Sequence, residues 1–227
     1  MNNQADIIDL NRDKTLTSSL NRTMYFFIKR LFDILMAIIG IIAMIPIVLL
    51  VKISYTLTGD FDSIFYKQKR IGKNGEEFDF YKFRSMIPNA DEVLKELLKN
   101  DKKLAKEYKI NKKLEHDPRV TKMGNILRKT SLDELPQVLN IIKNDMSVIG
   151  NRPYLPREKE DMGIYYNDIV KTKPGLTGLW QVSGRSNTTF EERLKIEQFY
   201  SNELNIKLDI KIFFKTFKVV FIHKGAK

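Results

Sequence analysis

Residues 31–51 read LFDILMAIIGIIAMIPIVLLV, and this apolar stretch decides the fold. It is 21 residues long and is interrupted only by Asp33, Gly40 and Pro46, so it meets the length of about 20 residues that a helix needs to cross a bilayer. A buried core helix explains this length and apolarity poorly. A signal peptide does not fit either, because the stretch exceeds an h-region and lacks a small-residue cleavage site. We therefore expect a membrane-embedded segment.

Basic residues flank the apolar stretch on both sides. Lys29 and Arg30 precede it, whereas Lys52 and the basic segment 67–70 follow it. Because basic flanks prefer the cytoplasmic side of a membrane, cations at both ends favour a segment that enters and leaves through the same leaflet. Pro46 interrupts the helical hydrogen-bond ladder towards the end of the stretch. We predict a re-entrant helix-break-helix and keep a single spanning helix as the alternative.

This interpretation divides the chain into three parts. Residues 1–22 are polar, rich in Asn, Ser and Thr, and are predicted to form a loosely ordered tail. The re-entrant membrane helix is expected over residues 23–54, and a cytoplasmic, membrane-associated domain over residues 55–227. Asp33, near the start of the apolar stretch, is expected to pair with the basic residues one turn back rather than lie unpaired in hydrocarbon.

The charge balance of the chain points to an anionic partner. The 227 residues include 39 Lys and Arg against 28 Asp and Glu, and the sequence pI is about 9.6. Nucleic acid, phosphorylated metabolites and acidic lipid headgroups all fit such a chain. The sequence contains no cysteine and only two histidines, His116 and His223. Disulfides and thiolate zinc sites are therefore excluded, and any metal should be a hard, oxygen-ligated ion.

Four further segments have patterns that predict secondary structure. Residues 64–84 alternate aromatic and polar side chains around Asn74-Gly75, which predicts a β-hairpin. Residues 89–114 predict a charged amphipathic helix, and residues 135–142 predict another helix. Residues 208–223 interleave phenylalanines with lysines, which indicates either an interfacial helix or an ordinary amphipathic helix on the core.

Basic side chains recur at places where a phosphate could bind. Lys82 lies on the second strand of the predicted hairpin, on the same face as Phe78 and Phe80. It either contacts a phosphate or remains a solvated lysine. Lys173 and Arg185 bracket a glycine-rich stretch whose backbone could approach a ligand closely, with a turn-rich surface loop as the alternative.

Two adjacent carboxylates, Asp133 and Glu134, lie within the segment SLDELPQ at residues 131–137, directly after two basic residues. An acidic pair surrounded by cations can stay ionised near neutral pH, where it can hold a divalent metal or attack an electrophile such as a phosphate. Ser131 and Glu134 also have the spacing of a capping box, in which acidic residues support the first turn of a helix. Spacing alone leaves both interpretations open.

Several short motifs occur in a fixed order along the chain. They are KRLFD (29–33), the proline of the apolar stretch, QKRIG (68–72), FYKFRSM (80–86), SLDELPQ (131–137), DMSVIG (145–150) and the stretch from Lys173 to Arg185. In this order they resemble the bacterial sugar transferase family, the monotopic polyprenol-phosphate phosphoglycosyl transferases. The resemblance covers nearly the whole chain, from about Phe27 to the C-terminus.

The resemblance implies a reaction and a set of site residues. Members of this family transfer a sugar 1-phosphate from a UDP-sugar to undecaprenyl phosphate, release UMP and use Mg²⁺. By motif position, Asp133 would be the nucleophile that attacks the β-phosphorus, and Glu134 would help to hold the metal. Lys82, Arg152 and Arg185 would contact the substrate phosphates.

The chain departs from the family pattern at two positions. Asn151 replaces the first proline of the usual Pro-Arg-Pro, which leaves Arg152 in place but weakens any inference about a rigid backbone there. Asn144 stands where the family often has a glycine before the aspartate. The implied role of Arg152 therefore needs support from its surroundings.

The combined prediction is a mixed, mostly α-helical monotopic membrane enzyme with a small β-hairpin and interfacial amphipathic helices. Residues 55–227 would form the catalytic domain on the cytoplasmic face of a bacterial cell membrane, where the enzyme would initiate an exopolysaccharide or a capsule. No nucleic-acid partner is expected, because the apolar stretch has no place in such a binder. The alternative is a non-catalytic basic module that recruits partners to anionic lipid, which gives no reason for the carboxylate pair. The sugar, which could be glucose, galactose or an N-acetylated or diamino sugar, and the oligomeric state stay open.

Overall fold

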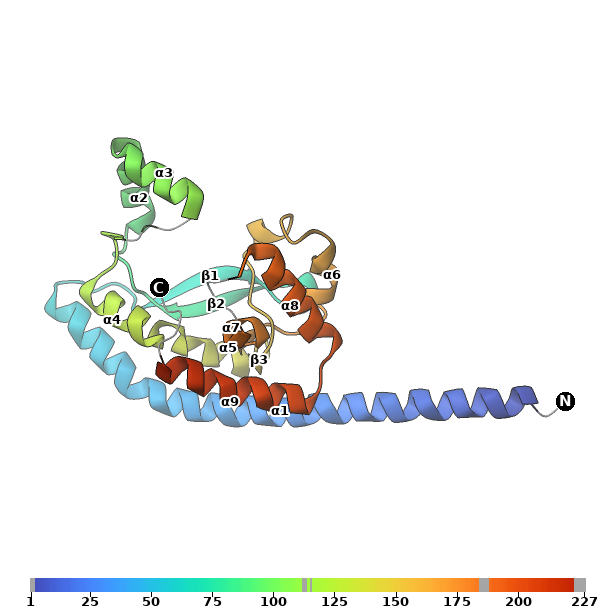
Figure 1. Ribbon diagram of the computed structural model, residues 1–227. Coiled ribbons are helices and arrows are strands. Elements are labelled where there is room, and N and C mark those ends of the chain that lie inside the picture. The colour runs from blue at the N-terminus through green and yellow to red at the C-terminus, as the bar shows by residue number, and fades with distance from the viewer. Residues whose placement is uncertain (1–2, 112–113, 115, 184–187, 223–227) are drawn as a thin grey trace. The chain divides into compact units, whose positions relative to one another are not determined.

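A computed structural model describes residues 3–111, 114, 116–183 and 188–222 of the chain (Figure 1). These residues form mostly helices, together with the predicted β-hairpin. The chain divides into two compact units, each built from separate parts of the sequence. The first unit comprises Met1–Ile39, Arg70–Phe78 and Ile141–Lys227, and the second comprises Gly40–Lys69 and Asp79–Asn140.

Helix α1 (Asn3–Leu57) begins well before the apolar stretch. Most of the polar segment 1–22, expected to be a loosely ordered tail, is therefore helical. The sequence contains no proline or glycine before Gly40. Lengthening an existing helix needs no new nucleus, so a stable apolar helix can propagate through polar neighbours.

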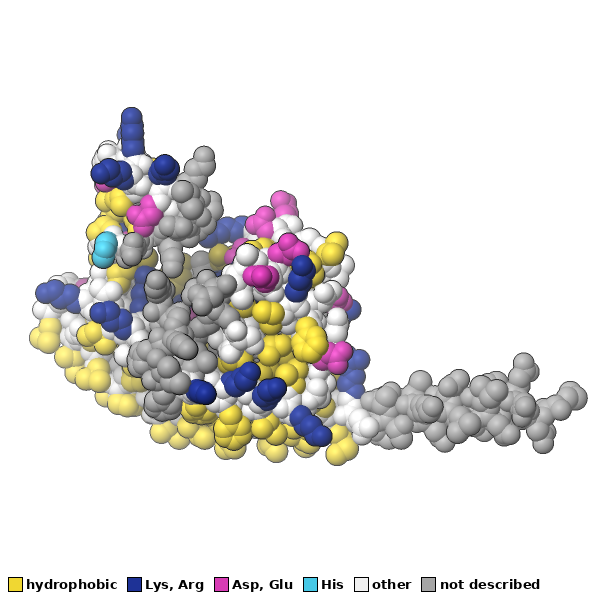
Figure 2. Space-filling view, viewed as in Figure 1, with side chains coloured by type: hydrophobic (Ala, Val, Ile, Leu, Met, Phe, Trp, Pro, Cys, Tyr) yellow, Lys and Arg dark blue, Asp and Glu magenta, His cyan; other side chains and the backbone are white. Residues whose placement is uncertain are grey.

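Helix α1 also continues through Pro46, where the sequence predicts a break. A proline removes the hydrogen bond to the carbonyl four residues back, here that of Ile42, and this change can bend a helix without ending it. The part Asn21–Leu57 is long and apolar enough to cross a membrane. Figure 2 shows hydrophobic side chains exposed along this helix. Membrane embedding therefore fits α1, and its re-entrant path stays a prediction.

Strands β1 (Phe65–Ile71) and β2 (Glu77–Phe83) pair as the predicted hairpin. The turn is the short 3-10 segment η1 (Lys73–Gly75), in which φ is 59° at Asn74 and 83° at Gly75. Asparagine and glycine adopt such left-handed backbone at the least cost. The Asn-Gly signal therefore identified the turn correctly.

In the first unit, helix α9 (Ile206–Ile222) lies beside α1 (Figure 1). Asp209 joins the two helices, because its carboxylate accepts a hydrogen bond from the Tyr25 hydroxyl at 2.9 Å and pairs with the Lys29 ammonium at 2.7 Å. All three groups are largely buried, so the pair is weakly screened by solvent. Lys29 of the KRLFD motif thus anchors the C-terminal helix.

The described aromatic side chains of α9 occupy two environments. Phe213 packs edge-on against Phe32 of α1, with 5.2 Å between the ring centroids. Phe214 and Phe217 remain exposed. One face of α9 therefore packs on the protein core. That the other, exposed face lies at a membrane interface stays a prediction. The expected end of this helix, at His223, lies outside the described residues.

Asp33 finds its hydrogen-bond partners elsewhere than the sequence predicts. Its carboxylate accepts from the Ser147 hydroxyl at 2.9 Å and from the Val148 N–H at 2.8 Å. Arg30, one of the two expected partners, donates to the carbonyl of Ile141 at 2.7 Å. A buried carboxylate needs local donors, and here a segment more than a hundred residues away supplies them. Helical spacing could not reveal such a long-range contact.

Strands β3 (Ser147–Ile149) and β4 (Gly175–Thr177) form a parallel two-stranded sheet that the sequence did not predict. A Cβ atom on Gly175 would lie 2.1 Å from the Gly150 backbone nitrogen, and one on Gly178 would lie 2.0 Å from the Gly150 carbonyl oxygen. These glycines let two backbone segments pack closely. The close approach seen here is between two segments of the chain, and approach of this stretch to a ligand stays a prediction.

Short helices complete the first unit around a small hydrophobic core. They are η3 (Pro156–Glu158), η4 (Gly163–Tyr165), α6 (Tyr166–Ile169), α7 (Leu179–Ser183) and α8 (Phe190–Asn202). The core comprises Ile71, Tyr154, Met162, Ile169 and Leu194. Tyr154 lies in the loop after β3, and Leu194 lies on α8. Because both side chains belong to this core, the loop after β3 packs against α8.

In the second unit, the predicted helix 89–114 is two helices, α2 (Ala90–Asn100) and α3 (Lys102–Asn111). Asp101 between them has extended backbone with φ −124°, and its carboxylate accepts from the N–H groups two and three residues further on. Aspartate favours such a cap over a helix interior, because its side chain competes for backbone donors. The prediction of one continuous helix was wrong because the leucine periodicity runs through this break.

Three helical segments then follow one another directly. They are α4 (Lys122–Thr130), the 3-10 helix η2 (Leu132–Gln137) and α5 (Val138–Ile142). The helix predicted over 135–142 is thus present as two pieces, and Pro136 lies in the 3-10 piece. This succession carries the two predicted carboxylates.

Candidate active site

The two carboxylates lie near the start of η2, where the chain changes direction. Ser131 ends α4 with left-handed backbone, φ 58°, and Asp133 and Glu134 follow it. Their side chains meet Lys82 on strand β2. The Lys82 Nζ atom lies 2.8 Å from Glu134 Oε1 and 3.4 Å from Asp133 Oδ2. The structure therefore brings together three of the residues selected from the sequence.

The capping-box alternative is not observed. The Ser131 side chain makes no cap hydrogen bond, and the Glu134 carboxylate pairs with Lys82. An N-cap residue normally has extended backbone, whereas Ser131 is left-handed. Reciprocal capping therefore does not explain this acidic pair.

The two carboxylates differ in their surroundings. The Asp133 side chain is 14% exposed and the Glu134 side chain is 44% exposed. Burial raises the pKa of Asp133, the Lys82 ammonium lowers that pKa, and the Glu134 charge raises it. Lys82 therefore helps to keep Asp133 ionised, which is the state required of a carboxylate nucleophile. Glu134 is more open to a ligand from solvent.

Asn140 on α5 fixes the strand that carries Lys82. Its amide is fully buried. The Nδ2 atom donates to the Asp79 carbonyl at 2.6 Å, and the Oδ1 atom accepts from the Tyr81 N–H at 3.1 Å. The Asn140 side chain thus makes two hydrogen bonds to the backbone of β2, as a neighbouring strand would. The only sequence signal for Asn140 is a polar residue inside the apolar run Val138–Ile142.

Helix α4 is fixed against the segment that follows β2. The Thr121 hydroxyl accepts from the Gly124 N–H at 2.8 Å, and the Thr121 N–H donates to the Ser85 carbonyl at 3.0 Å. Near the other end of the helix, Arg128 Nε donates to the Ser85 hydroxyl at 2.9 Å. The FYKFRSM motif therefore contributes two residues to this region. Lys82 contacts the carboxylates, and Ser85 contacts α4, the helix that precedes them.

Gly124 is the position where a small change should disturb this arrangement most. A Cβ atom there would lie 1.9 Å from the Ser85 carbonyl oxygen, so the backbone would have to shift. We expect Gly124→Ala to lower the free energy of unfolding by about 1–3 kcal/mol and to lower activity. Thermal unfolding in detergent measures the first effect. Asn125→Ala, at the neighbouring exposed position of the same helix, is the control and should match the unsubstituted protein; equal stability of both variants would contradict the close packing.

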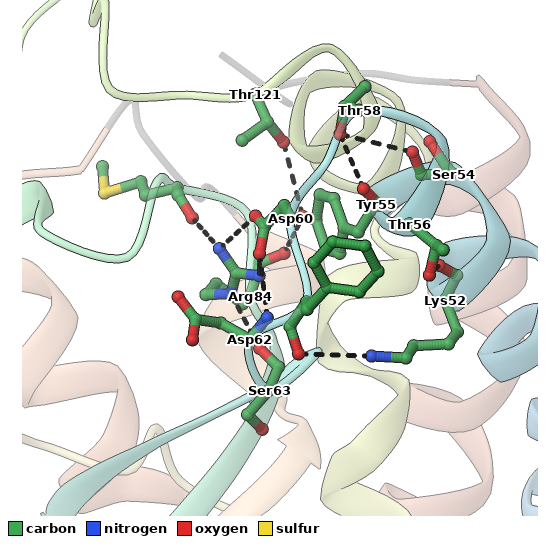
Figure 3. Close-up of polar contacts among 12 residues, drawn as sticks. Lys52, Ser54, Tyr55, Thr56, Thr58, Asp60, Asp62, Ser63, Arg84 and Thr121 are labelled. Atoms are coloured by element: carbon green, nitrogen blue, oxygen red, sulfur yellow. Dashed lines mark hydrogen bonds and ion pairs between the residues drawn. The ribbon is translucent and has the colours of Figure 1, made fainter.

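Arg84 joins these segments to the end of α1 (Figure 3). Its guanidinium donates to both carboxylate oxygens of Asp60 at 2.9 Å and lies 4.7 Å from the Tyr55 ring centroid. The hydrogen bond from Arg84 holds the pKa of Asp60 below its usual range. The Tyr55 hydroxyl donates to the Arg84 carbonyl and lies 3.3 Å from the Thr121 hydroxyl. The end of α1 is therefore bonded to the strand that carries Lys82 and to the start of α4.

The other two predicted phosphate contacts lie elsewhere in the chain. Arg152 belongs to the first unit, in the loop after β3, where its guanidinium lies 5.9 Å from the Trp180 ring centroid. Arg185 lies outside the described residues. Of the three predicted basic residues, Lys82 is the one that the structure describes in contact with the carboxylates.

Two carboxylates are the oxygen donors that the site offers to a divalent cation such as Mg²⁺. Within the described ranges, no group of three or more acidic or histidine side chains is placed to hold a metal ion. Mg²⁺ is usually held by one or two carboxylates together with substrate phosphates and water. Asp133 and Glu134 therefore fit Mg²⁺ in the presence of a diphosphate, and the more exposed Glu134 is the better placed ligand.

Comparisons with known proteins identify the family to which this chain belongs. A family model described as bacterial sugar transferase matches residues 24–223. The exopolysaccharide production protein ExoY of Sinorhizobium fredii is 42% identical over 198 residues, which cover 87% of each chain. The undecaprenyl-phosphate galactose phosphotransferase of Salmonella typhimurium is 44% identical over 203 residues, which cover 88% of this chain and 42% of that protein.

A third relative is the UDP-glucose:undecaprenyl-phosphate glucose-1-phosphate transferase of Escherichia coli. It is 33% identical over 224 residues, which cover 93% of this chain and 43% of that protein. The chain thus spans less than half the length of the Salmonella and Escherichia relatives and most of the length of ExoY. The chain belongs to the bacterial sugar transferase family. Its enzyme class is that of the phosphoglycosyl transferases, as its motifs predicted.

Proposed function

We propose that this chain transfers a sugar 1-phosphate from a UDP-sugar to undecaprenyl phosphate and releases UMP. The observation that carries the proposal is the contact of Lys82 with Asp133 and Glu134 in a member of this family. The names of the Salmonella and Escherichia relatives support the substrates. The name of ExoY supports a role in the synthesis of an exopolysaccharide or another surface polysaccharide.

In the proposed first step, Asp133 is the nucleophile. One of its carboxylate oxygens forms a bond to the β-phosphorus of the UDP-sugar, and the bond from that phosphorus to the bridging oxygen breaks. The bridging oxygen leaves with the electron pair as part of UMP. Lys82, beside the attacking carboxylate, offsets negative charge on the phosphate oxygens. The sugar 1-phosphate is then esterified to Asp133.

In the second step, an oxygen of undecaprenyl phosphate forms a bond to the same phosphorus. The bond from Asp133 to phosphorus breaks, and the carboxylate is regenerated as the leaving group. The product is the sugar linked to the lipid through a diphosphate. A covalent step of this kind lets a soluble donor and a membrane-bound acceptor use one site in turn.

Metal and arginine contacts complete the proposed site. Glu134 and the diphosphate oxygens would hold Mg²⁺, which when bound offsets the charge of the reacting phosphates. Arg152 and Arg185 are proposed as further phosphate contacts, since arginine binds phosphate oxygens through paired N–H groups. Of the residues named here, Glu134 pairs with Lys82 at 2.8 Å and the Arg152 guanidinium lies 5.9 Å from the Trp180 ring centroid, whereas Arg185 lies outside the described residues.

UMP formation tests the proposed reaction. The purified protein, Mg²⁺ and undecaprenyl phosphate are mixed with a panel of UDP-sugars, and UMP is measured. We expect one donor, or a few, to release UMP over many turnovers only when the lipid phosphate is present. This panel also identifies the sugar. Binding to anionic vesicles without UMP from any donor would support the non-catalytic membrane module and contradict the proposal.

The re-entrant path of α1 is part of the proposal and has its own test. The chain contains no cysteine, so single cysteines can be introduced at position 2 (Asn2→Cys) and at an exposed position of the catalytic domain (Asp161→Cys). We expect a membrane-impermeant thiol reagent to label both from the cytoplasmic side of inverted vesicles. Labelling of the two variants from opposite sides would mean that the helix spans the bilayer.

A further inference from the structure

The loop that carries Arg152 is held by two side chains of helix α8. The Glu197 Oε1 atom accepts a hydrogen bond from the Arg152 backbone N–H at 3.0 Å. One turn further along the helix, the Ser201 hydroxyl accepts from Asn151 Nδ2 at 2.7 Å. The two contacts fix consecutive residues of the loop to one helix.

Glu197 is an unusual residue to find at this place. Its side chain is 1% exposed, and burial of a carboxylate is costly unless donors and charges compensate it. Burial raises the pKa of Glu197 to about 7, although the Arg152 amide and the Arg193 charge favour the ionised form. A purely structural helix position would be filled at lower cost by an apolar side chain. The placement therefore indicates a task for this carboxylate.

Asn151 is the residue that departs from the Pro-Arg-Pro pattern, and its side chain makes several contacts. Its side chain is buried, and besides Ser201 its Nδ2 atom contacts the Ile169 carbonyl at 3.3 Å and the Thr172 hydroxyl at 3.4 Å. A proline restricts the backbone through its ring. Here an amide buried among acceptors restrains the same position through hydrogen bonds.

The Arg152 side chain is constrained at its far end as well. Its guanidinium lies 5.9 Å from the Trp180 ring centroid, and the Arg193 guanidinium lies 4.9 Å from the same ring. Arginine over an indole face is held in a limited set of orientations. Glu197 at the backbone and Trp180 at the guanidinium therefore define where Arg152 points.

We propose that Glu197 is a positioning residue for Arg152, and that the hydrogen bond from Asn151 to Ser201 is the second anchor of the loop that carries Arg152. The proposal rests on the proposed function, in which Arg152 contacts the substrate phosphates. Glu197 itself touches no substrate in this account; it acts by holding the Arg152 backbone.

Kinetics of Glu197 variants, with and without Arg152, test this role. We expect Glu197→Leu to lower kcat/KM for the UDP-sugar by about 10- to 100-fold, the range that a small misplacement of a binding group can cost. Glu197→Gln keeps an acceptor oxygen and should recover most of that loss. In an Arg152→Ala background, Glu197→Leu should change kcat/KM by about twofold or less, because its effect passes through Arg152.

The kinetic results distinguish a positioning role of Glu197 from a general effect on stability, and they test this role separately from the proposed function. If Glu197→Leu lowers kcat/KM by the same factor with and without Arg152→Ala, the positioning role is overturned. No effect of Arg152→Ala alone would show that the phosphate contact, and with it the premise, is wrong, while UMP release by the unsubstituted protein would still stand. If Glu197→Leu does not fold, Ser201→Ala removes only the second anchor and should show the same dependence on Arg152. Asn202→Ala, exposed on the same helix, is the control and should be unchanged.

Discussion

Replacing Asp133 by asparagine is expected to abolish UMP release, with a loss of about 10⁴-fold in kcat, the scale seen when a nucleophilic unit is removed. Asparagine has nearly the same shape, but its neutral amide does not attack phosphorus. The half-buried position beside Lys82 should tolerate the change, because Lys82 keeps its shorter contact, with Glu134 at 2.8 Å. The measurement is steady-state UMP release with the donor identified by the panel.

Two comparisons make the Asp133 result specific. Asp161→Asn, at an exposed position of the first unit, should keep normal activity. Thermal unfolding of Asp133→Asn should stay within a few degrees of the unsubstituted protein, so that lost activity does not reflect lost structure. Near-normal UMP release by a folded Asp133→Asn protein would contradict the assignment of the nucleophile.

Replacing Lys82 by methionine is expected to lower kcat/KM by about 10²-fold, because one preorganised charge at the reacting phosphate is lost. It should also change the pH dependence. Burial raises the pKa of Asp133 and the Lys82 ammonium lowers it, so removal of that ammonium raises the pKa further. The rate falls as Asp133 is protonated at low pH, and this acid limb should therefore move to higher pH in Lys82→Met.

Two other lysine variants distinguish charge from packing. Lys82→Arg keeps the positive charge, and its acid limb should stay close to that of the unsubstituted protein. Lys95→Met, on the exposed face of α2, should change neither the rate nor the pH profile. An acid limb at the same pH in Lys82→Met and in the unsubstituted protein would show that Lys82 does not set the ionisation of Asp133.

Local patterns predicted those parts of the fold that depend on neighbouring residues. The hairpin turn at Asn74-Gly75 was predicted correctly because those two residue types favour positive φ. Asp101 was missed as a break because its role depends on its own carboxylate capping the next helix, and the apolar periodicity continues through it. Periodicity therefore located the helical region 89–114 but could not divide it into two helices.

The candidate site was predictable only in part, because its support comes from residues far apart in sequence. Motif order selected Asp133, Glu134 and Lys82, and the structure brings these three side chains together. Asn140 is marked only as a polar residue within an apolar run and Glu197 was not selected from the sequence, since their donors and acceptors lie on distant segments. Buried polar side chains of this kind become visible only when the fold shows their partners.

The two departures from the family pattern have a physical explanation in the structure. Asn144 has φ 72°, a backbone for which glycine is the usual residue and asparagine the next best. Its side-chain oxygen also accepts a hydrogen bond from Lys173. Asn151 is anchored through its amide to Ser201. Both asparagine side chains thus hold their loops through hydrogen bonds of their own.

The covalent intermediate on Asp133 is the central claim, and a single-turnover experiment tests it most directly. The protein is mixed with Mg²⁺ and the identified UDP-sugar in the absence of lipid phosphate, quenched, and examined by intact-mass and peptide mass spectrometry. The account predicts a mass increase equal to one sugar phosphate, located on Asp133, released on addition of undecaprenyl phosphate and absent from Asp133→Asn. Full activity with lipid present, but no adduct on the enzyme under these conditions, would contradict the covalent route.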